Sequence, residues 1–463
     1  MTVAHPPSIH MVGIGGAGMS GLARLALQAG YRVSGTDRSG SAVLDDLAAL
    51  GAHVHVGHDA AAIDPATQEL VVSTAIAADN PEVAEARRRG IPVRHRSELL
   101  AALMTGYRGL AVAGAHGKST TSAMLWTMLG DASACIGATV GGGGGTGAVW
   151  GTGPWFVAEA DESDRSLLRL APEAVILLNV DHDHHSTYPT IEDVESVFAA
   201  FVGMVPSDGL IVAGPDQRAH RIAAESGRPV RVIGDAPGAW AWIDTRSRDG
   251  ATIAFADGGR LELELGVPGL HNATNALCAL ALAEWCGVPR ERAASRVAGF
   301  RGVGRRFELK GTVGNITVID DYAHHPAEIA ATLAGARERH HGRIVAVFQP
   351  HLYSRTKALW PELAQALGGA DVAIVTDVYA AREPVDPAVS GRLVANAVAP
   401  PTTAVFAPSL AEATDRAAQI AAPGDLILTL GAGDITDIGQ ELLRRLEYEY
   451  PPDPVGGGMR DSD

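Results

Sequence analysis

The sequence predicts an α/β protein built from three successive domains. Short apolar segments alternate with segments rich in alanine and leucine, a pattern typical of strands and helices in largely parallel sheets. This pattern occurs in three blocks, and 463 residues suffice for two to four domains of ordinary size. Because 46% of the residues are hydrophobic, each domain can bury a core of its own.

Strands and helices are expected to alternate within each block. In the first block we expect the helix Ser97–Met104 and the strands Ile9–Ile14, Val33–Thr36 and Leu70–Ser73. The strands expected in the second block are Gly109–Ala113, Trp155–Ala158, Ala174–Val180 and Gly209–Ala213. The third block begins near Gly311, with expected strands at Asn315–Asp320, Arg343–Phe348, Val372–Thr376 and Asp425–Leu430. Short apolar runs of this kind are consistent with buried parallel strands.

The second block also contains segments of another kind. Short alternating runs in Val232–Leu265 predict antiparallel strands, and Asn272–Cys286 is expected to form a long buried helix. The glycine run Gly141–Gly145 is too flexible for the interior of an element and is expected to be a loop.

Glycine-bearing junctions mark the expected linkers between domains. They lie at Gly106–Gly109 and Lys310–Gly314, which gives domains at residues 1–108, 109–312 and 313–450. Residues 451–463 are rich in proline, glycine and aspartate, and we expect them to be disordered.

Composition argues against several classes of protein. The net charge is −16 and there is no block of Lys or Arg, which argues against nucleic acid or an anionic membrane as the main partner. Met1–His10 does not have the pattern of a signal peptide, and no apolar run approaches the ~20 residues of a membrane span. We therefore expect a cytoplasmic protein with no membrane span, and an oligomer stays compatible with the sequence.

The cysteines support the same expectation. Cys135, Cys278 and Cys286 are too few for a disulfide framework and lack metal-ligand spacing. We expect them to be small buried hydrophobic residues in a reducing compartment.

A glycine-rich turn follows the first expected strand. Gly13-Ile14-Gly15-Gly16-Ala17-Gly18 opens a helix and fits the dinucleotide fingerprint, with Asp37 at the end of the next strand, where a ribose hydroxyl is often bound. Glycines let the backbone approach a diphosphate, and the helix N-terminus supplies partial positive charge. The turn therefore predicts a diphosphate site, whether for a dinucleotide or for a UDP-sugar.

A phosphate-binding loop opens the second block. Gly114-Ala115-His116-Gly117-Lys118-Ser119-Thr120 lies between an apolar strand and a helix. Its amides are expected to surround phosphates, with Lys118 at the β and γ oxygens and Ser119 or Thr120 on Mg²⁺. The loop is a variant, because Val112 stands where the standard loop has its first glycine.

Polar clusters end the next two strands. Glu159-Ala160-Asp161-Glu162-Ser163-Asp164 follows one strand, and carboxylates at such a strand end beside a phosphate loop are suited to Mg²⁺. Asn179-Val180-Asp181-His182-Asp183-His184-His185 follows the next strand. A single imidazole is tolerable in a partly hydrated Mg²⁺ site, whereas a zinc hydrolase or a surface histidine cluster are the alternatives.

Two further clusters end strands of the third block. They are Asp320-Asp321-Tyr322-Ala323-His324-His325-Pro326 and Gln349-Pro350-His351-Leu352-Tyr353-Ser354-Arg355-Thr356. Imidazoles, a phenol and a guanidinium at one sheet edge could hold a zwitterion, with Arg355 on a carboxylate and His324 at an amine. The alternative is two unrelated polar loops.

Taken together, the motifs resemble the Mur ligase family over residues ~8–435, in consistent order. The matching segments are Gly13–Ser20, Gly114–Thr121, Glu159–Asp164, Asp183-His184, Gly269–Asn275, Arg305–Glu308, Asp320–Pro326 and Gln349–Thr356. The family implies an N-terminal Rossmann-like domain for a UDP-sugar, a central ATPase domain and a C-terminal Rossmann-like domain for an amino acid.

The resemblance also implies roles for single residues. The UDP-sugar would be bound by Gly13, Gly15, Gly16, Ala17, Gly18, Met19, Asp37 and Ser73. ATP would be bound by Gly114, His116, Gly117, Lys118, Ser119, Thr120, Asn272, Arg306 and Asp321, and Mg²⁺, as two ions, by Ser119, Glu159 and His184. The amino acid would be bound by Tyr322, His324 and Arg355, and Lys118, His324 and Arg355 would act in catalysis.

The sequence departs from the family at two places. Several siblings have a modified lysine about fifteen residues after the metal histidine, but Phe198-Ala199-Ala200-Phe201 stands here, so no carbamylated lysine is expected. Leu352 stands where related alanine-adding enzymes often have a basic residue, which leaves more of the carboxylate binding to Arg355.

The implied reaction is an ATP-dependent ligation in peptidoglycan precursor synthesis. UDP-N-acetylmuramate would be activated as an acyl phosphate and then joined to L-alanine, with release of ADP and phosphate. One alternative is a sibling activity that adds a recycled tripeptide to the same UDP-sugar. A nicotinamide-dependent oxidoreductase would leave Lys118 and the acidic cluster unused, and a non-catalytic nucleotide switch would leave the third block's cluster unused.

Overall fold

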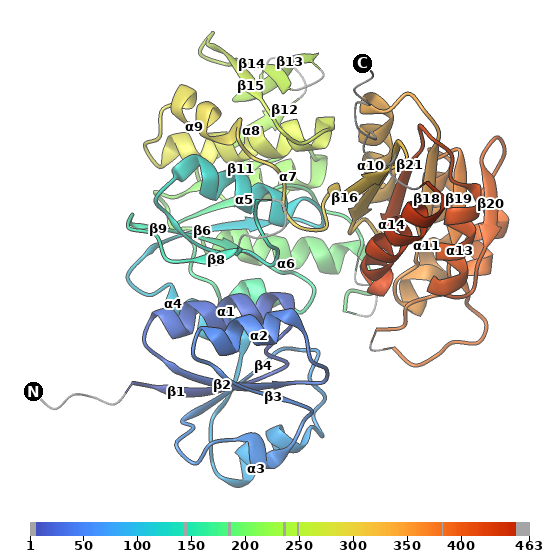
Figure 1. The fold of residues 1–463 in the computed structure, drawn as a ribbon. Helices are drawn as coiled ribbons and strands as arrows, with labels where there is room; N and C mark the ends of the chain where they lie inside the picture. The colour runs from blue at the N-terminus through green and yellow to red at the C-terminus, as the bar shows by residue number, and fades with distance from the viewer. Residues whose placement is uncertain are drawn as a thin grey trace, which may run out of the picture. The chain divides into compact units, whose positions relative to one another are not determined.

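The computed structural model describes residues 6–141, 146–183, 187–234, 238–247, 250–381 and 383–450. The chain divides into two compact units, one of Met1–Val267 with His271–Val303 and one of Pro268–Leu270 with Gly304–Asp463. In the described part, strands form two sheets in the first unit and one in the second (Figure 1). The predicted disordered tail, His184 and most of the glycine run Gly141–Gly145 lie outside the described residues.

The first sheet is parallel and has the strand order β3-β2-β1-β4-β5. Its strands are β1 (Ser8–Val12), β2 (Arg32–Asp37), β3 (His53–Val56), β4 (Glu69–Val72) and β5 (Val93–His95). The helices of this region are α1 (Ala17–Gln28), α2 (Ala42–Ala49), η1 (Ala60–Ala62), α3 (Pro81–Arg88) and α4 (Arg96–Leu103). Figure 1 shows α1 and α2 on one face of the sheet and α3 on the other. The parallel arrangement predicted for this block is confirmed.

The second sheet combines a parallel centre with an antiparallel end. Its order is β15-β14-β13-β12-β11-β10-β6-β9-β7-β8. The strands are β6 (Arg108–Ala113), β7 (Ser133–Cys135), β8 (Ala148–Val149), β9 (Trp155–Glu159), β10 (Ala174–Leu177), β11 (Leu210–Ala213), β12 (Val230–Gly234), β13 (Ala241–Ser247), β14 (Gly250–Phe255) and β15 (Arg260–Glu264). The antiparallel prediction for Val232–Leu265 is confirmed for β13, β14 and β15, whereas β12 pairs with β13 in parallel.

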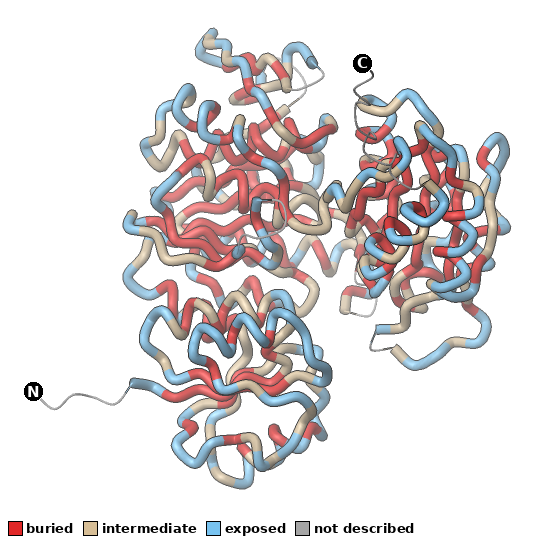
Figure 2. Tube along the Cα trace, viewed as in Figure 1, coloured by how far each residue is buried: buried red, intermediate tan, exposed pale blue. Residues whose placement is uncertain are grey.

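Helices cover both faces of this second sheet. They are α5 (Lys118–Leu129), η2 (Ser166–Arg169), α6 (Ile191–Gly203), α7 (Gln217–Glu225), α8 (Leu270–Trp285) and α9 (Arg290–Val297). The long helix predicted at Asn272–Cys286 is α8, and its residues are buried along nearly the whole length. Figure 2 shows the buried residues concentrated in the central strands.

The sheet of the second unit has the order β16-β17-β21-β18-β19-β20 and is parallel except for the β16–β17 pair. Its strands are β16 (Glu308–Val313), β17 (Ile316–Asp321), β18 (Ile344–Phe348), β19 (Val372–Val375), β20 (Thr403–Phe406) and β21 (Leu426–Leu430). Its helices are α10 (Pro326–Arg339), α11 (Tyr353–Leu367), α12 (Gly391–Ala397), α13 (Leu410–Ile420), η3 (Asp434–Asp437) and α14 (Ile438–Glu449). The strands predicted in this block are confirmed to within a residue at each end.

The linker predicted at Lys310–Gly314 is wrong. Residues 310–313 lie in β16, which pairs antiparallel with β17. A Cβ at Gly311 would lie 2.8 Å from the Leu443 side chain, so this glycine permits close packing of α14 and is not a hinge.

The cysteines form no disulfide, as predicted. Cys135 and Cys278 are buried, and burial raises the pKa of each thiol to about 12. Cys286 is only partly buried, in contrast to the expectation. None of the helices in the described part of the chain has the length and apolar character needed to cross a bilayer.

A buried polar network stabilises the first sheet on its α3 face. Glu82 of α3 has no exposed surface, and its carboxylate lies 2.7 Å from His10 Nε2, 2.8 Å from His58 Nδ1 and 2.9 Å from Thr36 Oγ1. Burial alone would raise the pKa of Glu82, but the bonds from His10, Thr36 and His58 together outweigh it and hold this pKa below its ordinary value. The carboxylate is therefore ionised and paired in the folded state.

Replacing Glu82 should destabilise the first unit strongly. Glu82→Ala leaves His10 and Thr36 without their buried partner, which should reduce the free energy of unfolding by about 3–5 kcal/mol. The difference should shrink as the pH falls below 4.5, because a carboxylate with a lowered folded-state pKa stabilises only while it is ionised. Denaturant unfolding at several pH values measures both effects.

Glu85 on the same helix is the matched control, because its partner Arg88 is exposed. Glu85→Ala should shift the unfolding midpoint little. A Glu82→Ala protein with the midpoint of the unsubstituted chain would show that the network does not stabilise the fold.

Candidate functional site

Three polar segments meet at one edge of the second sheet. β6 pairs in parallel with β9 on one side and with β10 on the other. The phosphate loop follows β6, the acidic run follows β9, and the segment from Asn179 to Asp183 follows β10. Because parallel neighbours end at the same edge, segments far apart in sequence are brought together.

The phosphate loop contacts Asn179, which follows β10, and Asn275 of α8. Gly117, with φ +84, is the N-cap residue of α5. It has no side chain to bond the first backbone amides of the helix, so these amides can bind an anion. A Cβ at Gly117 would lie 2.9 Å from Asn275 Oδ1 of α8. Asn179 accepts from the His116 amide at 2.9 Å and donates to the His116 carbonyl at 3.1 Å. Position 117 therefore requires glycine, because its φ is positive and because a Cβ there would clash with Asn275.

Lys118 lies across this loop beside the acidic run. Its Nζ donates to the carbonyl oxygens of Gly114 at 2.7 Å and Ala115 at 3.1 Å, and lies 2.9 Å from Glu162 Oε2. Burial alone would lower the pKa of Lys118, but the Glu162, Asp161 and Glu159 carboxylates hold it above its ordinary value. The residue is a partly buried cation, held at the position where phosphate charge is expected.

Two of the predicted metal ligands are in contact. Ser119 Oγ donates to Glu159 Oε1 at 2.9 Å, and Glu159 Oε2 accepts from the Gly137 amide at 3.0 Å. A hydroxyl and a carboxylate beside a phosphate loop form an oxygen donor set that suits Mg²⁺. The third predicted ligand, His184, lies outside the described residues. Thr120, the alternative to Ser119, is buried in α5.

The carboxylates of the acidic run contact two different parts of the chain, the phosphate loop and the first sheet with its helices. Glu159 and Glu162 face the phosphate loop, whereas Asp161 accepts from Arg96 at 2.6 Å. Asp164 lies 3.3 Å from His95 Nε2 and accepts from Thr74 Oγ1 at 3.2 Å. Glu159, the carboxylate of the run that was assigned to Mg²⁺, thus faces the phosphate loop, whereas Asp161 and Asp164 join the second sheet to residues of the first.

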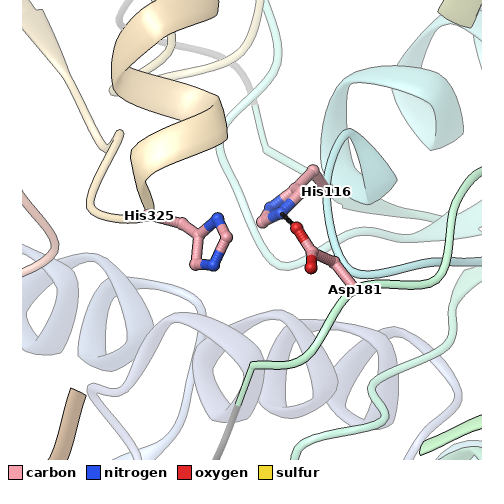
Figure 3. A group of neighbouring side chains, drawn as sticks. All are labelled: His116, Asp181 and His325. Carbon is pink, nitrogen blue, oxygen red and sulfur yellow. Dashed lines mark hydrogen bonds and ion pairs between the residues drawn. The ribbon is translucent and has the colours of Figure 1, made fainter. Parts of the chain in front are cut away.

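A histidine and an aspartate lie together beside the phosphate loop. His116 Nε2 lies 3.4 Å from Asp181 Oδ2, and Figure 3 shows the two side chains directed toward each other. The Asp181 carboxylate also accepts from the His182 amide at 2.8 Å. The pairing orients an imidazole predicted to contact ATP.

In the first sheet, the Asp37 side chain stabilises the glycine turn by hydrogen bonding. The Asp37 carboxylate accepts from the Gly15 amide at 2.9 Å and from the Arg38 amide at 2.7 Å, and the Gly13 amide donates to the Thr36 carbonyl at 2.8 Å. Gly16 caps α1 without a side-chain bond. The Asp37 carboxylate thus shapes the turn from which ribose binding was predicted.

The other predicted UDP-sugar residues lie in or near this turn. Ala17 and Gly18 form the first turn of α1, and a Cβ at Gly18 would lie 3.1 Å from an Arg96 guanidinium nitrogen. Met19 follows, with its side chain buried in the core, so it can offer a ligand only its backbone. Ser73 follows β4 and is partly buried.

In the second unit, aromatic rings line the predicted amino-acid site. The Tyr322 and His324 rings lie 5.2 Å apart, His324 and His351 5.9 Å apart, and His351 stacks on Tyr379 at 5.8 Å. The rings follow β17, β18 and β19. The two polar strand ends are therefore one cluster and not unrelated loops.

Arg355 belongs to this ring cluster. It lies in the first turn of α11, and its NH1 lies 3.0 Å from His351 Nδ1, which must accept because a guanidinium only donates. Arg355 is buried, as is its neighbour Leu352, whose φ is +68. The structure thus places Tyr322, His324 and Arg355 together, as the amino-acid site requires.

The predicted nucleotide residues Arg306 and Asp321 also lie in the second unit. Asp321 accepts from the Phe307 amide at 2.7 Å and the Ala323 amide at 2.8 Å. Burial raises the pKa of Asp321 to about 6 although Arg306 opposes the shift. Arg306 donates to Glu328 at 3.2 Å. The carboxylate of Asp321 shapes the turn after β17.

Sequence reasoning did not assign several side chains that the structure places in these clusters. They are Asn179, Glu162, His351, Tyr379 and Glu328. Position directly after a buried strand was a usable signal for Asn179 and His351. The Arg306–Glu328 pair had no such signal, because its members are far apart in sequence and meet only through the fold.

Family models match three successive parts of the chain. The model described as "Mur ligase family, catalytic domain" matches residues 8–108, "Mur ligase middle domain" matches residues 154–283, and "Mur ligase, glutamate ligase domain" matches residues 305–433. The three matched segments each cover part of a different sheet described above.

Whole-chain relatives agree with these matches. A protein of Renibacterium salmoninarum named UDP-N-acetylmuramate–L-alanine ligase is 46% identical, with 95% of this chain and 96% of the relative covered. Among solved structures, the UDP-N-acetylmuramate–alanine ligase of Thermotoga maritima is 28% identical, with coverage of 96% and 99% and a TM-score of 0.81. A murein peptide ligase of Psychrobacter arcticus is 26% identical, with coverage of 95% and 98% and a TM-score of 0.74.

These likenesses confirm the predicted three-domain α/β fold and the resemblance noted in the sequence. They extend over nearly the whole length of the chain and of the relatives. The chain belongs to the Mur ligase family.

Proposed function

We propose that the protein joins L-alanine to the carboxylate of UDP-N-acetylmuramate and converts ATP to ADP and phosphate. The observation that carries this proposal is the partly buried Lys118 in a phosphate loop, with Ser119 and Glu159 in contact beside it. The relative with 46% identity carries the name of this activity. The reaction belongs to peptidoglycan precursor synthesis, and we place the protein in the cytoplasm.

The first chemical step activates the substrate carboxylate. A carboxylate oxygen attacks the γ-phosphorus of ATP, the bond to the β–γ bridging oxygen breaks, and ADP leaves. The product is an acyl phosphate of the muramyl group. Lys118 is placed to stabilise the charge that moves to the departing oxygens, and the α5 N-terminus contributes in the same direction.

Magnesium is part of the proposal. Ser119, Glu159 and His184 would hold it, and Glu159 and Ser119 already supply oxygens at one point beside the loop. When bound, Mg²⁺ neutralises phosphate charge. Lys118 must exchange its pairing with Glu162 for phosphate oxygens when ATP binds, since the same ammonium serves both.

The second step forms the amide. The amine of alanine attacks the acyl carbon, a tetrahedral intermediate forms, and its collapse releases phosphate. Arg355 would bind the alanine carboxylate, while Tyr322 and His324 flank the amine, and His324 accepts the amine's proton. Asn272, Arg306 and Asp321 would contact the nucleotide.

The glycine turn Gly13–Gly18 would bind the UDP diphosphate at the start of α1. We assign the UDP-sugar, ATP and amino-acid domains to residues 1–108, 109–303 and 304–450. The second boundary moves from residue 312 to Gly304, because β16 pairs with β17 in the second unit. A sibling reaction with a recycled tripeptide is not favoured, because relatives of 42–47% identity over nearly the whole chain carry the name of the L-alanine ligase, whereas the murein peptide ligase is 26% identical.

Removing the loop cation should abolish most turnover. Lys118→Ala should reduce kcat by about 10²–10³, since one preorganised donor at developing charge contributes roughly 3–4 kcal/mol. Phosphate release in the presence of all three substrates measures the loss. Lys357→Ala is the control, because Lys357 is exposed and pairs only at the surface with Asp386. Near-normal turnover of Lys118→Ala would contradict the proposed ATP site.

The metal prediction concerns Glu159. Glu159→Ala should raise the Mg²⁺ concentration needed for half-maximal activity, because one anionic oxygen ligand is lost. Glu173→Ala is the control, because Glu173 precedes β10, at the opposite edge of the sheet, and pairs with Arg108. A zinc-specific chelator should leave the enzyme active, and inactivation by that chelator with Mg²⁺ in excess would favour the hydrolase alternative.

The alanine site is tested through Arg355. Arg355→Ala should raise the KM for alanine roughly ten- to a hundredfold, because a charge-assisted hydrogen bond contributes about 1.5–3 kcal/mol. ATP binding should change little. The control is Arg337→Ala, since Arg337 is exposed and pairs with Asp371. Normal alanine binding by Arg355→Ala would remove this residue from the site.

The same assay compares possible amines. Glycine and serine should be slower substrates by about 1–3 kcal/mol of transition-state binding, and a tripeptide should be rejected because its amine and carboxylate are too far apart. A tripeptide that outcompetes L-alanine would favour the sibling activity.

A further inference from the structure

Glu328 lies in the first turn of α10, and each of its two carboxylate oxygens accepts hydrogen bonds. Its Oε1 accepts from Arg306 NH1 at 3.2 Å, and its Oε2 accepts from the backbone amides of His324 at 3.2 Å and His325 at 3.4 Å. The same Oε2 lies 3.2 Å from the ring atom Nδ1 of His324. The Glu328 side chain is only 8% exposed, so its charge acts at close range with little screening.

These contacts determine where His324 carries its proton. Nδ1 lies 2.9 Å from the Tyr322 carbonyl oxygen as well as 3.2 Å from the Glu328 carboxylate. A carbonyl and a carboxylate only accept, so Nδ1 must be the donor. In the neutral ring the accepting lone pair is then on Nε2.

Helix capping alone does not produce this arrangement. The N-terminus of α4 has the same kind of box, in which Glu98 Oε2 accepts from the His95 amide at 2.9 Å. His95 is the N-cap residue of α4, as His325 is of α10, and its Nδ1 accepts from the Ser97 amide at 3.3 Å. His324 precedes the cap of α10, and its Nδ1 has the opposite role. The donor role of His324 Nδ1 therefore comes from its contacts with Glu328 and Tyr322, and not from the N-cap position, which His325 occupies.

Other polar groups also face the His324 ring. Those beside the ring are Tyr322 at the end of β17, His351 after β18 and Glu328 of α10. Arg306, Asp321 and Arg355 interact in turn with these residues or with one another. Among these groups, the carboxylate in direct contact with the ring is that of Glu328, and Arg306 pairs with its other oxygen.

We propose that Glu328 is a positioning residue for amide formation. It keeps the proton of His324 on Nδ1 and so makes Nε2 the ring nitrogen that accepts the proton of the attacking amine. This inference rests on the proposed function and adds to it a residue that acts through His324. As the N–C bond forms, the amine proton moves to Nε2, the Nδ1 proton stays in place, and Glu328 stabilises the resulting imidazolium. Through Arg306 the same carboxylate joins the amine site to a residue proposed to contact ATP.

Glu328→Gln separates this role from helix capping. Glutamine keeps an oxygen that can accept from the two amides, so the cap survives, but the negative charge is lost. The kcat of alanine-dependent phosphate release should fall about ten- to a hundredfold, a part of what a general base contributes. The acid limb of kcat/KM for alanine should move to lower pH, because the neighbouring anion that favours the imidazolium is gone.

Glu98→Gln is the matched control, since it makes the same change in the capping box of α4. It should leave both rate and pH profile unchanged. Glu328→Asp keeps the charge and should retain the acid limb of the unsubstituted enzyme, even where its shorter side chain lowers the melting temperature.

A spectroscopic measurement tests the tautomer directly. With ¹⁵N-labelled histidine and assignment through His324→Gln, the ring of His324 should show the Nδ1–H form in the full-length enzyme and lose that preference in Glu328→Gln. A folded Glu328→Gln enzyme with an unshifted pH profile and a rate within twofold of normal would overturn the proposal, as would an Nε2–H ring in the unsubstituted enzyme. Absence of alanine-dependent phosphate release from the unsubstituted enzyme would instead contradict the proposed function.

Discussion

The parallel pairing of β6 with β9 and β10 is the constraint on which the candidate ATP site depends. Parallel neighbours end at the same edge, so the loop after β6, the carboxylates after β9 and Asn179 after β10 meet without being close in sequence. Glu162 and Glu159 stabilise the partly buried Lys118 there, since removing an unpaired cation from solvent is costly. One of these carboxylates, Glu159, is also a proposed Mg²⁺ ligand, in contact with Ser119.

Much of the fold could be predicted from the sequence because buried parallel strands are continuous apolar runs. β18 is an example, since all of its residues are buried and its predicted limits differ by one residue from the observed ones. Glycine was a less certain guide. Gly311 suggested a hinge, but it lies in β16 against Leu443, because a missing side chain can serve close packing as well as flexibility.

The site was predictable at the level of motifs and less so for single side chains. The resemblance singled out Glu159 in the acidic run after β9, whereas the partners of the other carboxylates depend on the turn that the chain makes there. Asp161 and Asp164 turn toward Arg96 and His95, and no local pattern indicates this. Glu328 illustrates the same limit, because its partner Arg306 lies 22 residues away in sequence.

In the proposed mechanism the substrate carboxylate is phosphorylated before the amine attacks. This is tested most directly with UDP-N-acetylmuramate whose carboxylate carries ¹⁸O. An acyl phosphate intermediate transfers one carboxylate oxygen to phosphorus, so the phosphate released in the presence of ATP and L-alanine should contain one ¹⁸O atom. Released phosphate without ¹⁸O, alongside a ligated product, would contradict the account.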